Sequence, residues 1–252
     1  MSHQIKNRVQ EKHVACHNPV FTGLLYVFPE KHSIMPKTKI VKSIAKALDL
    51  QYHPMMSKHL VIGLSGYAGV GKDLFYQKLS EKIDIKRHAL ADALKSDLRN
   101  VIIKDQGIDI MNCTRDEKNI IRPLLVNYGK AMRAESLGRH YIERLSKEIL
   151  PLKENICITD IRYNFFKNDE VHWLKNELNG CLVYISQYRV DVDEGARIYK
   201  QAPNEEEKEH TEFVAKAADY TVDWEYTEDK STLDIHIYKF IEWLSTWKQT
   251  TN

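Results

Sequence analysis

Beyond residue 57, the chain alternates between two hydrophobic patterns. Five short, almost continuous apolar runs are typical of strands buried on both faces of a parallel sheet. These runs cover residues 59–65, 85–90, 155–160, 181–185 and 220–224. Apolar residues at helical spacing separate or follow them, in residues 74–83, 92–150, 169–178, 211–218 and 233–247. This alternation predicts an α/β fold of three layers, with helices on both faces of a five-stranded parallel sheet.

The longest helical segment, residues 92–150, carries no strand signal and ends before Pro151. Asp92 is expected to be the N-cap of its first helix. The buried stripe of that helix would consist of Leu94, Leu98, Val101 and Ile102. The rest of the segment, from residue 114 to residue 150, is basic and contains Arg115, Arg122, Arg133, Arg139 and Arg144. Arginine binds phosphate well, so this insertion predicts a lobe for a second anionic substrate, although Arg115 and Arg144 are expected to be solvated.

Two segments lack apolar periodicity. Residues 187–210 carry Arg189, Arg197 and Lys200 beside the acidic run 205–207, and a loop of this length predicts a mobile lid. Residues 1–57 form an N-terminal extension in which residues 40–48 fit one amphipathic helix, and disorder over the first thirty residues is equally compatible. The functional domain is therefore expected to be residues 58–250.

A glycine-rich motif joins the first predicted strand to the first helix. It fits G-x-x-x-x-G-K-[ST] except at its last position. Its residues are Gly66, Tyr67, Ala68, Gly69, Val70, Gly71, Lys72 and Asp73. Glycines let the backbone N–H groups turn toward phosphate oxygens, the helix dipole favours an anion, and Lys72 adds a positive charge. The alternative, an ordinary glycine-rich turn, would not need a strand before it and a helix after it.

Asp73 stands where a hydroxyl residue normally reaches Mg²⁺. A carboxylate is a hard oxygen ligand that binds this ion directly or through water, so Asp73 is the candidate metal ligand. The alternative is that Asp73 only caps the helix through backbone N–H groups.

Three further residues are candidates at the carboxyl end of the sheet, where open α/β folds bind ligands. Asp160 ends the third apolar run, Arg162 follows two residues later, and Lys95 lies in the first turns of the helix after the second run. The alternatives are a structural Asp160–Arg162 turn pair and a solvated surface role for Lys95.

Composition narrows the class of protein. The 252 residues carry a net charge of +2, which gives no general field for nucleic acid and favours a small substrate. Small-molecule nucleotides are the partners expected from the glycine-rich motif. Cys16, Cys113, Cys157 and Cys181 lack C-x-x-C spacing, which favours free thiols in a reducing compartment. The apolar runs are far shorter than a membrane span, so a cytoplasmic protein is expected. A monomer and a homodimer both remain open.

Several motifs in this order resemble the bacteriophage deoxynucleoside monophosphate kinases, over residues 57 to about 247. They are the Gly-Lys-Asp end of the loop, Leu90-Ala91-Asp92-Ala93-Leu94-Lys95, Arg122-Pro123-Leu124-Leu125 with Gly129, Asp160-Ile161-Arg162, and His210-Thr211-Glu212. Members of that family often place Thr after the loop Asp, whereas this chain has Leu74, so the role of metal ligand would fall on Asp73 alone.

The resemblance implies a P-loop kinase fold, ATP and Mg²⁺ as cofactors, and phosphoryl transfer to a deoxynucleoside monophosphate for DNA precursor synthesis, in the host cytoplasm if the chain is of phage origin. It implies catalytic roles for Lys72, Asp160 and Arg162. Together with the basic lobe and the lid, it implies acceptor binding by Lys95, Arg122, Arg133 and Asp160, and lid contacts by Arg189 and Arg197. The alternative is a kinase of another small phosphorylated metabolite, since the phosphomevalonate kinases of animals have a similar loop. A regulatory nucleotide switch is disfavoured because D-x-x-G and N-K-x-D are absent from the sequence.

Overall fold

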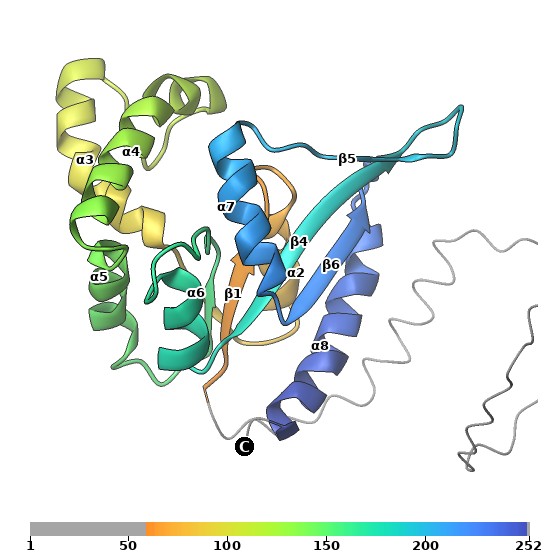
Figure 1. The fold of residues 1–252 in the computed structure, drawn as a ribbon. Helices are drawn as coiled ribbons and strands as arrows, with labels where there is room; N and C mark the ends of the chain where they lie inside the picture. The colour runs from red at the N-terminus through yellow and green to blue at the C-terminus, as the bar shows by residue number, and fades with distance from the viewer. Residues whose placement is uncertain (1–58, 251–252) are drawn as a thin grey trace, which may run out of the picture. The chain divides into compact units, whose positions relative to one another are not determined.

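The computed structural model describes residues 59–250, and side chains up to residue 247 (Figure 1). The strands are β1 (Val61–Ser65), β2 (Lys86–His88), β3 (Ile156–Ile158), β4 (Cys181–Val190), β5 (Arg197–Tyr199) and β6 (Tyr220–Glu225). The helices are α2 (Lys72–Ser80), α3 (Leu90–Gln106), α4 (Arg115–Glu135), α5 (His140–Ile149), α6 (Glu170–His172) with its π-helical continuation η1 (Trp173–Glu177), α7 (Glu205–Lys216) and α8 (Thr232–Thr250). The expectations for residues 1–57 and for Cys16 lie outside the described residues.

Five strands form the predicted parallel sheet. β1 pairs with β3 and β4, β2 pairs with β3, and β6 pairs with β4, which gives the order β2, β3, β1, β4, β6. Ile62, the second residue of β1, therefore lies opposite Cys157 on one side and Cys181 on the other. The sixth strand, β5, is antiparallel to the far end of β4.

Helices cover both faces of this sheet. On one face, Phe75 of α2 and Phe240 of α8 lie with their ring centroids 5.4 Å apart, among apolar residues of β1, β4 and β6. On the other face, Trp173 and Leu174 pack with Val214 of α7 and with α5. Figure 1 shows α6 and α7 in front of the sheet and α2 behind it. The expected three-layer α/β fold with a five-stranded parallel sheet is confirmed.

The segment between β2 and β3 consists of α3, α4 and α5. Ile102 of α3 and Ile121 of α4 are buried in a small apolar cluster of their own, separate from the two clusters that cover the sheet. Helices α3 and α4 therefore have an apolar core of their own.

The expected N-cap at Asp92 was wrong. The capping residue of α3 is Ala89, and the first two helical N–H groups, those of Leu90 and Ala91, donate to the carboxylate of Asp160 at 2.9 and 2.8 Å. A residue from the end of β3 thus supplies the anion that this helix start needs. The buried stripe of α3 was also wrong at Val101, which is 51% exposed.

Two element boundaries differ from those expected from the sequence. Residues 187–210 are not an irregular loop, because β4 continues to Val190, β5 returns as a hairpin, and α7 begins at Glu205 rather than at Thr211. The Asn204 side chain accepts the N–H of Glu207 at 2.7 Å, a capping bond that starts α7 early.

Three described cysteines, Cys113, Cys157 and Cys181, are not joined in disulfides, as expected. Cys157 and Cys181 are completely buried, and burial raises the pKa of the Cys157 thiol far above its usual range. Within residues 59–250, no helix has the length and apolar character needed to cross a membrane.

Candidate functional site: a phosphate loop facing a cleft

The phosphate loop lies where the sequence predicted it, between β1 and α2. Gly71 is the N-cap of α2 with φ 97°, and Gly66 has φ 136°, both left-handed conformations that other residues rarely adopt. A Cβ atom on Gly66 would lie 2.2 Å from the carbonyl oxygen of Ile185 in β4. Buried Trp224 of β6 donates from Nε1 to the carbonyl of Val70 at 2.8 Å, which fixes the middle of the loop against the sheet.

Lys72 is the first residue of α2, and its side chain turns back over the loop. Its ammonium donates to the carbonyl oxygens of Gly66 at 2.6 Å and Tyr67 at 2.9 Å. Burial, followed by the positive charge of Arg162, lowers the pKa of Lys72 to about 8. The low pKa means that Lys72 holds its proton less firmly than an exposed lysine does.

Asp73 is exposed in the first turn of α2. Within residues 59–247 it forms no hydrogen bond, and no side chain caps α2, so the capping alternative has no support. No described group of three or more His, Cys, Asp or Glu residues could enclose a metal. A single free carboxylate nevertheless fits Mg²⁺, which commonly takes one or two carboxylates with water and nucleotide phosphates. Asp73 is thus the residue that would hold this ion.

Asp160 and Arg162 follow β3 at the carboxyl end of the sheet. Both oxygens of Asp160 are engaged by the N–H groups of α3 described above, so its observed role is to hold that helix. Arg162 is exposed, lines a cavity beside the loop, and forms no ion pair with Asp160 in the described part of the chain. The turn-pair alternative is therefore not what these residues form, and the catalytic roles of both remain predictions.

One face of α4 points across the cleft. Val126 lines the cavity, and Lys130, one turn later, pairs with Glu206 of α7 at 2.5 Å. Arg122 lies one turn before Val126 on this face and has no ion-pair partner among residues 59–247. The role of Arg122 in binding an anionic acceptor remains a prediction.

Arg133, on the same helix, is placed differently. Its guanidinium is buried, donates to both oxygens of Asp169 at 2.9 Å and to Glu170 at 3.0 Å, and lies 3.6 Å from the centre of the Tyr163 ring. Glu170 also accepts the N–H of Arg162 at 2.7 Å. These contacts give Arg133 a structural role behind the cleft, because protein carboxylates already occupy its donors.

Lys95 pairs with Asp92 at 2.9 Å, one turn earlier on α3, and Asp92 also pairs with Arg87 at 2.7 Å. Arg87 and Asp92 line a second cavity, of about 230 Å³, between β2, α3 and α5, together with Arg144. Arg144 was expected to be simply solvated, but it pairs with Asp97 at 2.5 Å. The place of Lys95 in an acceptor site remains a prediction.

Three cations lie on or directly after the hairpin of β4 and β5. Arg189 stacks on Tyr226 with its guanidinium 4.6 Å from the ring centre, and Arg197 pairs with Asp223 at 3.2 Å. Lys200 lies just after β5, and its side chain extends to Gly69. A Cβ atom added to Gly69 would lie 3.2 Å from the ammonium nitrogen of Lys200. Of the three, Lys200 is therefore the cation whose contact with the loop is observed.

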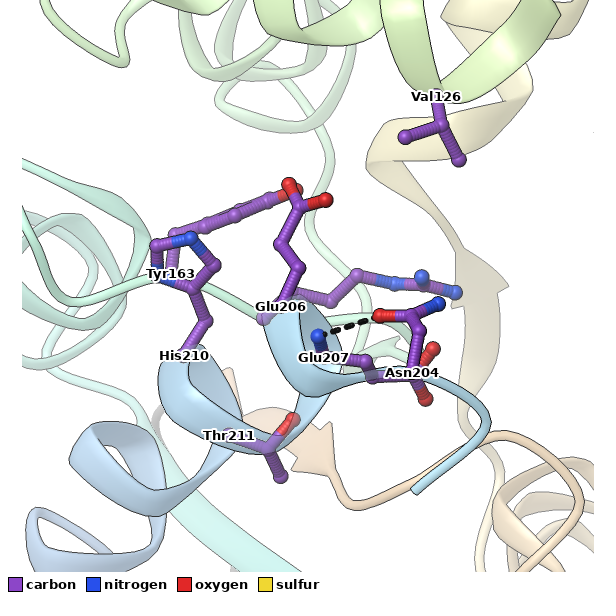
Figure 2. A pocket seen from close by; sticks show the side chains of 8 residues that line it. Val126, Tyr163, Asn204, Glu206, Glu207, His210 and Thr211 are labelled. Carbon is purple, nitrogen blue, oxygen red and sulfur yellow. Dashed lines mark hydrogen bonds between the residues drawn. The ribbon is translucent and has the colours of Figure 1, made fainter. Parts of the chain in front are cut away.

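The cavity beside the loop is formed by α4, the segment after β3, and α7 (Figure 2). Its volume is about 50 Å³. His210 and Tyr163 lie side by side along it, with ring centroids 5.0 Å apart, and Glu206 projects between them and Val126 (Figure 2). The cavity thus has flat rings and a cation, Arg162, within one small space.

Four residues that matter for this geometry were not among the predicted site residues: Trp224, Lys130, Lys200 and Glu207. Glu207 accepts the N–H of Ala68 in the phosphate loop at 2.6 Å. Only Lys200 carried a signal in the sequence, as a cation in the predicted lid. The others act through partners far away along the chain, which spacing does not reveal.

No family model and no curated protein matches this chain. Among solved structures, shikimate kinase from Bacteroides thetaiotaomicron is 15% identical, with a TM-score of 0.39 over 74% of this chain and 98% of that one. Shikimate kinase from Aquifex aeolicus is 19% identical, with a TM-score of 0.36 over 77% and 99%. Dephospho-CoA kinase from Campylobacter jejuni is 13% identical, with a TM-score of 0.33 over 75% and 98%. Likeness this weak transfers neither substrate nor activity.

Proposed function

We propose that the chain is a kinase that transfers the terminal phosphoryl group of ATP to a deoxynucleoside monophosphate. The observation that carries this proposal is the phosphate loop with Lys72, opening beside a cleft that Arg162 lines. In the reaction, the bond between the γ-phosphorus of ATP and the β–γ bridging oxygen breaks. A phosphate oxygen of the acceptor forms the new bond, which leaves ADP and a deoxynucleoside diphosphate.

The residues of this chain have positioning and electrostatic roles, which are what phosphoryl transfer chiefly requires. Backbone N–H groups of the loop and the start of α2 bind the ATP phosphates. Lys72 and Arg162 stabilise negative charge on the transferred group, and Arg122 holds the acceptor phosphate from α4. Asp73 would hold Mg²⁺, which when bound neutralises charge on the nucleotide phosphates.

A nucleotide acceptor is favoured over an aliphatic phosphorylated metabolite by the rings along the cleft. Tyr163 and His210 offer flat surfaces against which a base can pack, and Arg133 supports Tyr163 from behind. A metabolite such as phosphomevalonate would leave these rings without a matching group.

The test is a coupled assay of ATP-dependent product formation with each of the four deoxynucleoside monophosphates and with phosphomevalonate. We expect turnover with at least one deoxynucleotide and none with phosphomevalonate. Activity on phosphomevalonate alone would replace this proposal with the alternative, and the absence of turnover with every acceptor would remove both.

A further inference from the structure

A glutamate of this chain occupies a backbone N–H donor of the glycine-rich loop. Oε1 of Glu207, in the first turn of α7, accepts the backbone N–H of Ala68 at 2.6 Å, across 139 residues of sequence. Ala68 is inside the phosphate loop, whose N–H groups are the donors expected to bind phosphate oxygens. A carboxylate oxygen and a phosphate oxygen are ligands of the same kind, so they compete for such a donor.

Two contacts hold Glu207 in this place. Asn204 caps α7 by accepting the N–H of Glu207 at 2.7 Å, which fixes the backbone of the glutamate. The neighbouring Glu206 pairs with Lys130 of α4 at 2.5 Å, which ties the same turn to the opposite wall of the cleft. The first turn of α7 therefore spans from the phosphate loop to the helical lobe.

The size of the cleft agrees with this arrangement. The cavity of about 50 Å³ is lined by Glu206 and Glu207, whereas pockets for small molecules usually measure about 300–1,000 Å³. Movement of the first turn of α7 away from the loop would free the Ala68 N–H and, at the same time, widen the cavity.

We propose that Glu207 is a built-in competitor for the phosphate loop, which the polyphosphate of a nucleotide must displace before the cleft can open. The inference rests on the proposed function in one respect, the binding of a polyphosphate at this loop. Glu207 thus weakens binding of every anion at the loop, and Glu206 transmits its displacement to the acceptor side through Lys130.

The test uses tripolyphosphate, which carries no base or sugar, and Mg·ATP, with affinities measured by calorimetry on the full chain. Glu207→Ala should bind tripolyphosphate about tenfold more tightly than the unsubstituted protein, because a carboxylate that must be expelled is gone. Glu207→Gln keeps the size of the side chain without its charge and should gain about threefold. Glu209→Gln is the matched control, since Glu209 is an exposed glutamate of the same helix, and it should change affinity by less than about twofold.

The outcomes separate this inference from the proposed function. Tighter tripolyphosphate binding in the Glu207 variants supports the competitor even when no acceptor is phosphorylated, which would refute only the kinase. Equal or weaker binding in both variants overturns the competitor even when deoxynucleotides are phosphorylated. If neither the unsubstituted protein nor any variant binds tripolyphosphate or Mg·ATP, both are overturned.

Discussion

The two sides of the cleft are constructed in different ways. On the phosphate-loop side, eight consecutive residues provide the turn, the donors and the lysine. On the lobe side, the walls come from α4, the segment after β3, and α7, held by pairs such as Lys130–Glu206 and Arg133–Asp169. The first side is a property of a local sequence, and the second exists only after the chain has folded. Substitutions on the loop side should therefore change chemistry first, and some on the lobe side should change stability first.

The largest expected effect on the lobe side is on folding. Arg133→Ala removes the cation that both Asp169 and Glu170 contact and leaves these buried acidic side chains without it, which should lower the free energy of unfolding by about 3–5 kcal/mol. Denaturant unfolding measures the loss, with Arg115→Ala, an exposed arginine of the same helix, as the control. A stable Arg133 variant that had lost only acceptor binding would restore Arg133 to the acceptor site.

On the loop side the largest effect should be on turnover. Lys72→Ala removes a charge that stabilises the transferred phosphoryl group, and we expect turnover to fall at least about a hundredfold in a folded protein. Lys104→Ala, at the exposed end of α3, is the control for loss of a lysine. Near-normal turnover in folded Lys72→Ala would contradict the assignment of the loop.

The dependence of activity on pH should report the protonation of the same lysine, Lys72. A lysine whose pKa is lowered to about 8 is charged below that pH and neutral above it. Since only the ammonium attracts phosphate, kcat/KM for ATP should fall above pH 8, by about tenfold per pH unit. An arginine stays charged above pH 8, so the activity that remains in Lys72→Arg should not decline in this pH range. A decline that persists in Lys72→Arg would belong to another group.

Arg122→Ala would sharpen the difference between Arg122 and Arg133, which lie on the same helix α4. Arg122 is on the cleft face without an ion-pair partner among the described residues, so its loss should raise KM for the acceptor by roughly tenfold and change the melting temperature little. The acceptor KM and the melting curve are measured on the same preparation. A large fall in stability would mean that Arg122, like Arg133, holds the lobe together.

The smallest effect is expected at Asp73. Asp73→Asn replaces a charged oxygen ligand with a neutral one and should raise the Mg²⁺ concentration for half-maximal rate by roughly threefold. Asp73→Ser should recover part of this loss. Superimposable Mg²⁺ titrations for the three proteins would take Asp73 out of the metal site.

The sequence predicted the structural features that depend on residues close together along the chain. The five parallel strands, the loop and the helical lobe follow from hydrophobic periods and one motif. The N-cap of α3 was misassigned because its anion, Asp160, comes from another strand. The hairpin at 190–200 was read as a loop because β5 is a short, fully exposed strand that leaves no buried side in the pattern. Arg133 looked like a phosphate ligand because its carboxylate partners lie 36 and 37 residues away.

The central claim is that this loop and this cleft together move a phosphoryl group between nucleotides. Single turnover with ATP labelled in its γ-phosphate, in the presence of a deoxynucleoside monophosphate, follows that group directly. We predict that the label appears in the deoxynucleoside diphosphate as ATP disappears, and that Lys72→Ala abolishes its appearance. Label found only in inorganic phosphate, at the same rate with and without the acceptor, would contradict the claim.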